Sequence, residues 1–344
     1  MERTSFYRLT YLELRNELLA AGLNPVGANR LFNWHYKKKK SSALSEDLAN
    51  STQEFIKSRY EFELPHISLI QEADDKTVKF LFELKDGKKV ETVLIPFHNK
   101  YSICLSSQVG CAMKCSFCHT GQQGLSRHLK TEEIVGQFLA VCSWLKENRP
   151  NDGDALNLVF MGQGEPLHNF NEVARACHIF LSQHGASLAA QRITISTAGY
   201  LPGIKRWREE MPGVNLALSL HSTIKNKRDE LIPLNRAYPL EEVLGEIDKI
   251  ELSRKQFVTY EYLLIDDFNN SDEDAQRFGE LLEPRRALLN IIPFNPVPGL
   301  SYKRPTPQKV QDFAQKLGEF DLPVLVRDTK GDEVMAACGQ LNSK

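Results

Sequence analysis

The sequence predicts an α/β chain: a partial (β/α)6-type TIM barrel preceded by a helical and β-hairpin accessory region. Three observations predict it. From about Tyr101 onward, short β-rich runs alternate with amphipathic helical stretches, the pattern of parallel βα units. Before that point, apolar residues first recur at helical spacing and then alternate as in a hairpin. The composition, 42% hydrophobic and 25% charged among 344 residues, excludes disordered and fibrous classes.

Residues 1–62 are predicted to form an N-terminal helical accessory domain. Apolar residues recur at helical spacing in Tyr11–Leu19. A second helix is expected after Pro25; it runs through Tyr36 and ends in Lys37–Lys40.

Residues 63–97 are predicted to form a β-hairpin extension. Apolar and polar residues alternate in Thr77–Leu84 and in Lys89–Ile95. The turn-forming pair Asp86 and Gly87 separates the two runs, which is typical of a hairpin.

Residues 98–328 are predicted to form the barrel, and residues 329–344 a C-terminal tail. The expected strands are Ser102–Ser106, Leu156–Met161, Arg192–Thr197, Val214–Leu220, Phe257–Ile265, Leu288–Phe294 and Val324–Arg327. The expected helices include Glu132–Lys146, Phe170–Ser182 and Pro239–Ile250. Polar clusters follow four of the strands, beginning at Gly162, Ser196, Ser219 and Asn295. Each alone is consistent with a plain turn, but in a parallel barrel they share one rim, where ligands bind.

Charge and cysteine usage restrict the class of protein. Lys plus Arg number 43 and Asp plus Glu 44, so the net charge of −1 excludes a binder of the histone type but not a local basic patch. No run of eighteen uncharged residues exists and the N-terminus lacks an apolar stretch, so we expect no membrane span and no signal peptide. Seven cysteines, an odd number, argue against a disulfide framework. We therefore expect a cytoplasmic chain.

Three cysteines lie close together just after the first predicted barrel strand. Cys111, Cys115 and Cys118 are separated by three and by two residues. Three thiolates on one short loop can hold three corners of a 4Fe–4S cluster, whereas ordinary electron-transfer clusters take four cysteines. The remaining iron would be open, and an open coordination position usually serves chemistry.

Other uses of these cysteines were weighed. A Cys₃His zinc site would need His119 or His128 as the fourth ligand, and His119 is adjacent to Cys118, too close for a finger-like spacing. Cys104 as a fourth cluster ligand would lie on the strand rather than on the loop. Buried inert thiols are the remaining alternative. We favour the open cluster over all three.

The cysteine triplet is the signature of radical S-adenosylmethionine (SAM) enzymes, and the chain resembles that superfamily. The resemblance implies that the open iron binds the amino and carboxylate groups of SAM, and that the reduced cluster splits SAM to a 5′-deoxyadenosyl radical. Gly162–Pro166 resembles the superfamily's Gly-Glu segment. There Gly164 lets the backbone approach the ligand closely, and Glu165 would accept a hydrogen bond from the SAM amino group.

The chain also resembles a narrower family, the RlmN/Cfr branch of radical SAM methyltransferases, which methylate an adenine carbon in RNA. The matching blocks are Val90–Pro96, Cys104–Met113, Phe160–Leu167, Arg192–Gly199, Asn215–His221, Ile292–Pro296 and Ala336–Leu341. Within the branch, the segments that look closer to RlmN than to Cfr are Gln108–Met113, Gly164–Leu167 and Asn295–Gly299.

The resemblance implies a role for each site residue. Cys111, Cys115 and Cys118 would hold the cluster. The SAM site would be lined by Gly164, Glu165, Ser196, Ser219, Leu220, His221 and Asn295. Cys338 would carry a methyl group taken from one SAM; the radical made from a second SAM would activate it for addition to the adenine carbon. Cys104 would then form a disulfide bond with Cys338 to release the RNA, and Glu91 would take the proton from the adenine carbon.

The chemistry of the reaction agrees with those roles. An aromatic adenine C–H carbon is too poor a nucleophile for direct displacement on SAM, whereas a carbon radical avoids that limit. The resemblance implies structured RNA as the partner, 23S rRNA and in some members tRNA, an electron donor such as flavodoxin, and a monomer. Carbon 2 is the RlmN-like target and carbon 8 the Cfr-like alternative. A non-catalytic, metal-stabilised RNA-binding scaffold is the alternative from another class.

Two lysine-rich segments are candidates for RNA contact. Lys37–Lys40 follows Trp34, His35 and Tyr36, a combination suited to phosphate contact and base stacking, although a solvated helix end explains the charges equally well. Lys225, Lys227 and Arg228 are expected on the active rim.

Three residues depart from the family pattern. Gln163 stands where Met is common, Met335 where an acidic residue is usual, and His119 where Ala or Ser is frequent. Because every expected thiol is present, these departures bear on substrate identity and efficiency rather than on reaction class.

Overall fold

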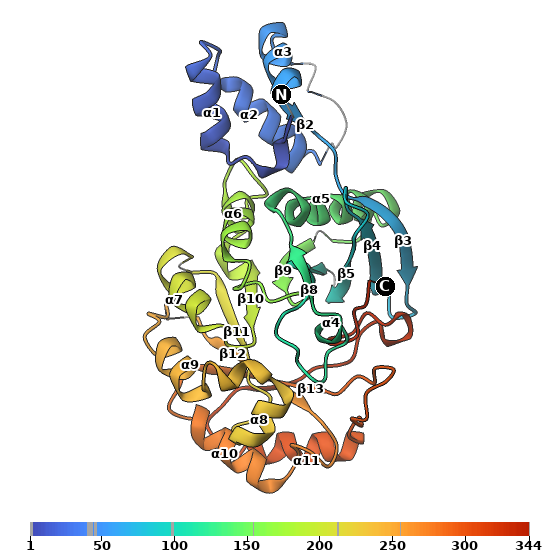
Figure 1. Cartoon of the computed structure of the whole chain (residues 1–344), viewed down its shortest axis with the longest axis vertical. Helices are drawn as coiled ribbons and strands as arrows, with labels where there is room; N and C mark the ends of the chain where they lie inside the picture. Colours follow the sequence, from blue (N-terminus) through green and yellow to red (C-terminus); the bar gives the residue numbers. More distant parts are fainter. Residues whose placement is uncertain are drawn as a thin grey trace.

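One ten-stranded sheet organises the molecule (Figure 1). The computed structural model describes residues 3–39, 44, 47–97, 100–153, 155–211, 213–254 and 256–343. Across the sheet the strands follow the order β14-β13-β12-β11-β10-β9-β6-β5-β4-β3. Strands β6 and β9 to β14 run parallel, whereas β3, β4, β5 and β6 pair antiparallel.

The parallel strands lie within two residues of the predicted ones. They are β6 (Lys100–Cys104), β9 (Ala155–Phe160), β10 (Ile193–Thr197), β11 (Asn215–Ser219), β12 (Val258–Leu264), β13 (Ala287–Pro293) and β14 (Val324–Val326). Since β14 and β3 are the two ends of the strand order, the parallel strands form an open arc. The partial barrel predicted from the alternating pattern is therefore confirmed.

Helices follow the strands around the outside of the arc (Figure 1). They are α5 (Thr131–Asn148), α6 (Phe170–Leu181), α7 (Leu201–Glu210), α8 (Lys225–Leu231), α9 (Leu240–Ile247), α10 (Asp272–Leu282) and α11 (Pro307–Leu317). Cys142 in α5 and Cys177 in α6 are fully buried among apolar side chains, as structural cysteines are.

The predicted hairpin is part of the same sheet. Strands β4 (Val78–Glu83) and β5 (Lys89–Phe97) form it, and β3 (His66–Glu72), which was not predicted, adds an outer strand. Strand β5 pairs with β6, so the hairpin extends the barrel sheet without a break.

The N-terminal helices lie beyond α5, at the top of Figure 1. They are α1 (Tyr11–Ala20), α2 (Val26–Phe32), a π-helical turn (Asn33–Lys37) and α3 (Asn50–Arg59). Thr10 begins α1 with a capping box, in which its hydroxyl accepts from the Glu13 N–H and its own N–H donates to the Glu13 carboxylate. Two-residue strands β1 (Thr4–Ser5) and β2 (Tyr60–Glu61) pair across the base of these helices.

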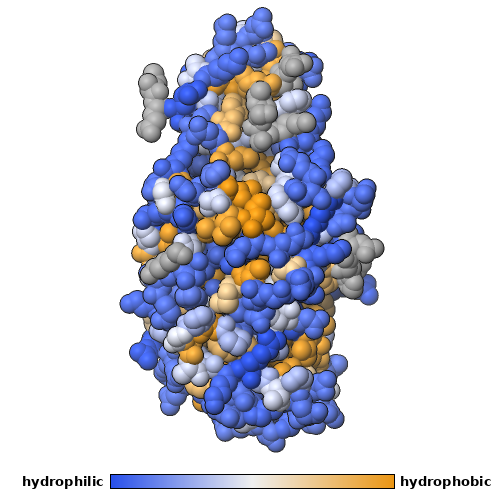
Figure 2. All heavy atoms as spheres, turned by 90° about the vertical axis from the view of Figure 1, so that its right-hand side faces the viewer, coloured by the Kyte–Doolittle hydropathy of each residue, from blue (hydrophilic) through white to orange (hydrophobic). Residues whose placement is uncertain are grey.

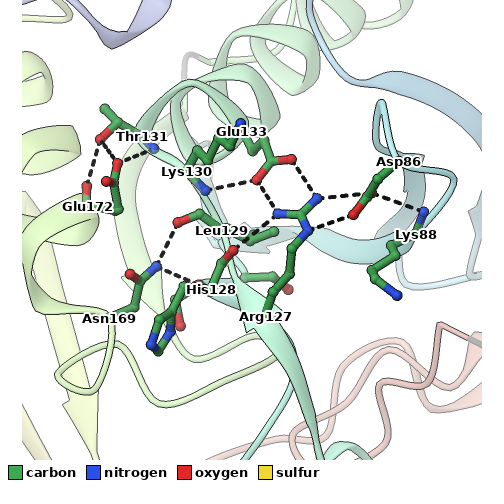
Figure 3. Close-up of polar contacts among 12 residues, drawn as sticks. Asp86, Lys88, Arg127, His128, Leu129, Lys130, Thr131, Glu133, Asn169 and Glu172 are labelled. Atoms are coloured by element: carbon green, nitrogen blue, oxygen red, sulfur yellow. Dashed lines mark hydrogen bonds and ion pairs between the residues drawn. The ribbon is translucent and has the colours of Figure 1, made fainter.

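A polar network fixes where the sheet extension meets the barrel (Figure 3). The Arg127 guanidinium lies between two carboxylates. Its nitrogens are 2.8 Å from an oxygen of Glu133 and 2.7 Å from an oxygen of Asp86 in the hairpin turn. The Asn169 amide donates to the Leu129 carbonyl at 2.8 Å. These contacts join the hairpin turn, β8 (Leu125–His128), the start of α5 and the loop after β9.

One side of the molecule exposes apolar residues around the outer strand. Figure 2 views the side on which β3 forms the sheet edge, and hydrophobic residues gather there between hydrophilic ones. Leu69 and Ile70 of β3 are exposed by 49% and 40%. No helix within the described residues is long and apolar enough to cross a membrane.

Removing a ring from the interface between α10 and the sheet should destabilise the fold. Phe278 is fully buried and its ring lies 4.6 Å from that of Tyr262 on β12. We expect Phe278→Ala to lower the free energy of unfolding by about 3–5 kcal/mol, because the lost contacts leave a cavity. Urea denaturation of the metal-free chain measures this. The control is Arg277→Ala, at the exposed residue next to Phe278, which should change the free energy of unfolding by less than about 0.5 kcal/mol. Equal changes for the two variants would contradict the role of Phe278 in the core.

Asp86→Asn should remove the ion pair with Arg127, and the resulting loss of stability should depend on pH. The Arg127 guanidinium lowers the pKa of Asp86 to about 2, below the value of about 4 for an unfolded chain. The stabilisation is therefore present above about pH 4 and is lost as the pH falls toward 2. Because the pair is partly exposed, we expect the free energy of unfolding of Asp86→Asn to be about 0.5–1 kcal/mol below that of the wild type at pH 7. This difference should become smaller below about pH 4. Denaturation at several pH values tests this, with the exposed Asp74→Asn as control; a difference independent of pH would refute it.

Candidate active site

A pocket lies at the carboxyl ends of the parallel strands, on the rim where the sequence predicts a shared site. Its cavity volume is about 160 Å³. The cysteine loop, the ends of β9 to β13 and the C-terminal tail form its wall. The predicted residues that line it are Cys111, Cys115, Cys118, Gly164, Glu165, Ser196, Ser219, His221 and Cys338.

Backbone contacts fix the cysteine loop at both ends. Strands β7 (Gln108–Gly110) and β8 pair across its base, and the Cys111 N–H donates to the Gly124 carbonyl at 3.0 Å. Gly110 has a φ of +74°, and a Cβ there would lie 1.9 Å from the Gly124 oxygen, so no side chain fits. The Ser116 N–H donates to the Leu231 carbonyl at 3.1 Å. The three thiols are therefore placed by the fold.

The donor set, three thiols in the wall of one pocket, is of the ligand type that iron–sulfur clusters take. Within the described part of the chain, no three His, Cys, Asp or Glu side chains converge on one point as the ligands of a single metal ion do. In a cubane each cysteine binds its own iron, so its ligands stay apart. Burial raises the pKa of Cys111 to about 12 and also raises the pKa of Cys115 and Cys118. These side chains are thus neutral thiols until a metal deprotonates them.

His119 and His128, the two candidates for a fourth zinc ligand, each form a hydrogen bond with an amide side chain. His128 Nδ1 lies 3.0 Å from the Gln108 amide, and His119 Nε2 lies 3.0 Å from the Asn342 amide. Neither histidine lines the pocket among its described residues. Neither histidine therefore joins the three thiols in the wall of the pocket.

Glu165 is held rigidly beside the cysteine loop. Its two carboxylate oxygens accept from the backbone N–H groups of Ala198 at 2.8 Å and Leu167 at 3.1 Å. Burial raises the pKa of Glu165 to about 7. Gly164 has a φ of +102°, and a Cβ there would lie 2.5 Å from the Gln108 side chain. Backbone rather than side chain therefore faces the pocket at residue 164, as close ligand approach requires.

His221 presents one ring nitrogen to the pocket side. Its Nδ1 accepts from the Leu263 N–H at 3.0 Å, so the ring hydrogen of the neutral form is on Nε2. Burial, together with the Arg228 charge, lowers the pKa of His221 to about 3, so the ring is neutral at physiological pH. Neutral His221 is thus a hydrogen-bond donor through Nε2.

Two predicted SAM-site residues lie outside the pocket lining. The Leu220 side chain is fully buried in the apolar core, and only its backbone, which binds Glu261 and Arg228, is near the site. The Asn295 amide donates to the Cys338 carbonyl at 3.2 Å. Asn295 therefore holds the loop that contains Cys338 rather than contacting the pocket directly.

Cys338 is exposed and lies on a loop fastened on both sides. Its neighbour Gly339 accepts from the His119 N–H at 2.8 Å, and Gln340 donates to the Pro296 carbonyl at 3.1 Å. Cys104 lies on β6, in a small cluster with Val93, Ala336 and Leu341. The structure thus brings the two lone thiols to the same region although they are far apart in the sequence.

The Cys104–Cys338 disulfide expected from the family resemblance is absent from the structure. All seven cysteines are free thiols. Burial, followed by the proximity of the Cys338 charge, raises the pKa of Cys104, so that thiol is protonated and unreactive at rest.

Glu91 lies on β5 next to the pocket but not in its lining. Its Oε1 lies 3.1 Å from the Lys79 ammonium nitrogen, and its Oε2 accepts from the Asn342 N–H at 2.6 Å. Its own N–H donates to Gln163 Oε1 at 2.9 Å. Glu91 is therefore buried in a closed polar network.

The three departures from the family pattern all touch the C-terminal tail or belong to it. Gln163 Oε1 accepts from the Ser343 hydroxyl at 2.6 Å, and His119 binds Asn342. The Met335 carbonyl lies 3.4 Å from the Lys79 ammonium nitrogen. These residues thus help to place the tail.

Two buried charged residues near the site were not identified from the sequence. Glu261 on β12 lines the pocket and accepts from the Asn290 amide at 2.9 Å. Lys79 on β4 is the partner of Glu91. A charged residue inside an otherwise apolar strand was the available signal for both.

The residues considered for RNA contact are placed in different environments. Arg228 lies at the rim, where it donates to the carbonyls of Ser219 and Ala198, but it is fully buried and therefore not available for RNA contact. His35 and Tyr36 are buried as well, so they are not available for base stacking.

Three of the lysines considered for RNA contact have partners of their own. Lys38 lies over the Trp34 ring at 5.3 Å, while Lys40 is outside the described residues. Lys225 pairs with Asp229 and Lys227 with Asp274. These ion pairs reduce the positive charge that the rim offers to phosphate groups.

Comparison with known proteins identifies relatives over the whole chain. The family model of the Radical SAM superfamily matches residues 105–279. A probable dual-specificity RNA methyltransferase RlmN of Syntrophomonas wolfei is 40% identical over 91% of this chain and 90% of its own length. One of Aquifex aeolicus is 39% identical over 100% and 98% of the two chains.

A solved structure covers nearly the same length. The crystal structure of a radical SAM methyltransferase from Sphaerobacter thermophilus superposes with a TM-score of 0.90 at 34% identity, over 99% of this chain and 100% of that one. The fold, the cysteine triplet and these similarities agree. The chain belongs to the radical SAM superfamily and, within it, to the RlmN family of RNA methyltransferases.

Proposed function

We propose that this chain methylates carbon 2 of an adenosine in 23S rRNA, and in tRNA, by way of an S-methylcysteine at Cys338. One observation carries the proposal: the Cys338 thiol lines the same pocket as Cys111, Cys115 and Cys118. A thiol at the mouth of a radical SAM pocket can receive a methyl group inside the pocket and present it outward. A structural cysteine would be buried instead, as Cys177 is.

The cysteine loop would hold a 4Fe–4S cluster with SAM beside it. When bound, the two supply a transferable methyl group and a 5′-deoxyadenosyl radical. Glu165, with both oxygens fixed by backbone N–H groups, offers an acceptor for the SAM amino group. His221 offers a donor through Nε2, and Ser196 and Ser219 add hydroxyl groups to the same wall.

Cys338 would carry the methyl group to the adenine, with its carbonyl held by Asn295. Glu91 would accept the proton from adenine carbon 2, while the electron pair of the C–H bond restores the aromatic ring and the unpaired electron passes back to a one-electron carrier. The Cys104 thiolate would then attack the Cys338 sulfur and form a transient disulfide. The bond from sulfur to the transferred carbon would break with its electron pair on that carbon, which takes up a proton to become the methyl group. The buried, protonated state of Cys104 keeps that step from occurring before RNA binds.

Structured RNA is the proposed partner, and a flavodoxin-like protein is the proposed one-electron donor. We propose that residues 1–62 form the RNA-binding domain, with Lys38 and Trp34 on its surface. The functional unit would be a cytoplasmic monomer.

The test of the function is nucleoside mass spectrometry of 23S rRNA and tRNA, after reaction with anaerobically reconstituted protein, SAM and a reductant. We expect 2-methyladenosine in both RNAs. 8-Methyladenosine would instead identify the Cfr-like reaction, and no modified nucleoside despite full RNA binding would identify a non-catalytic scaffold.

Cys338→Ala should abolish methylation. We expect no methyl group on the protein and a product rate lower by about 10³-fold or more, as for loss of a covalent nucleophile. Intact-protein mass and nucleoside mass spectrometry measure the two effects. Cys177→Ala, at a buried cysteine remote from the pocket, should retain both; product formation by Cys338→Ala would refute the carrier role.

Cys104→Ala should stop the reaction one step later. Because the Cys338 sulfur can no longer be attacked, we expect the protein to remain covalently joined to the RNA. Denaturing gels with labelled RNA detect the joined species, which the wild type should not accumulate. Free methylated RNA released by Cys104→Ala at the wild-type rate would contradict the assignment.

A further inference from the structure

Lys79 is a buried cation that lies between apolar residues of β4. Its side chain is 9% exposed, and that of its partner Glu91 is 4% exposed. The lysine nitrogen lies 3.1 Å from Glu91 Oε1. An ammonium group withdrawn from water at this depth needs a partner of opposite charge, and a buried ion pair of this kind more often specifies an arrangement than adds stability.

The strand register places this pair on the face that carries the reactive thiols. Lys79 is opposite Val93, and Val93 is opposite Cys104 on the next strand. Glu91 is two residues before Val93 and therefore lies on the same face, diagonal to Lys79. The hairpin thus delivers a cation and a carboxylate to the sheet face on which Cys104 lies.

The same ammonium group reaches the segment that carries Cys338. Its nitrogen is 3.4 Å from the Met335 carbonyl oxygen. The second oxygen of Glu91 accepts from the Asn342 N–H at 2.6 Å. Contacts of Lys79 and Glu91 therefore bracket Cys338 from both sides along the tail.

We propose that Lys79 is a positioning residue of the methyl-transfer site, which holds the Glu91 carboxylate by Oε1 and the Cys338 segment by the Met335 carbonyl. The inference rests on the proposed function, in which Glu91 accepts the adenine proton at its other oxygen. For the base to reach Oε2, the Asn342 N–H must leave it. Lys79 remains on Oε1 through that exchange, because it belongs to a strand and not to the tail.

Lys79→Met tests the proposal, because it keeps the length of the side chain and removes the ammonium group. We expect the methyl group to load onto Cys338 within twofold of the wild type, since loading does not need Glu91 and the Cys338 loop keeps its contacts with Asn295 and His119. The rate of RNA methylation should fall about 10²-fold, as for a displaced catalytic group, with accumulation of covalent protein–RNA species. Glu91→Gln should give the same pattern. Lys79→Arg should recover most of the rate, and Lys89→Met, at an exposed lysine of β5, should behave as wild type.

The outcomes separate this inference from the function on which it rests. A wild-type rate for Lys79→Met, or equal losses of loading and methylation with a lowered melting temperature, would overturn the positioning role. If Lys79→Met does not fold, Lys79→Gln replaces it in the test, because it keeps an N–H donor without the charge. Methyl loading onto Cys338 and the rate of RNA methylation then decide whether Lys79 is a positioning residue. Absence of methyladenosine from the wild type itself would instead refute the proposed function.

Discussion

The arrangement of the site depends on one constraint: three thiols must be held at a strand-end rim by a loop that carries no regular structure of its own. Backbone bonds supply that constraint. The β7–β8 ladder closes the loop, Gly110 permits the close crossing at Gly124, and Leu231 binds Ser116. Because partial burial raises the pKa of the thiols, the loop is prepared for metal but chemically quiet without it.

The hairpin before the barrel contributes two charged side chains, Lys79 and Glu91, to the sheet face on which Cys104 lies. A one-residue shift between β4 and β5 would turn Lys79 and Glu91 to the opposite face, since side chains alternate along a strand. The Arg127 bridge from the cysteine-loop side to Asp86 of the hairpin turn fastens the two parts at a second point. Register and ion pair together set the distance between the carboxylate and the thiols.

The sequence predicted most of the framework, and the errors have physical causes. Parallel strands were found from alternation with helices and the cysteine triplet from spacing, because these are local patterns, whereas Gly164-Glu165 was found from the family resemblance. The environments of Arg228 and His35 depend on packing across elements, so contact with RNA was assigned to two side chains that are buried. Lys79 and Glu261 were missed because the apolar residues around them outweighed a single charge, although each charge marked a position where the core had to provide a partner.

Cys338 lies between two backbone positions in the left-handed region, Met335 with a φ of 52° and Gly339 with a φ of 87°. Neither α-helix nor strand spans the segment between them. A rotation about these two positions would move the sulfur and break the contacts of Asn295 and His119 and the packing of Ala336 against Cys104. In the proposed reaction, the length of this short segment would limit how far the RNA base can lie from the sulfonium donor.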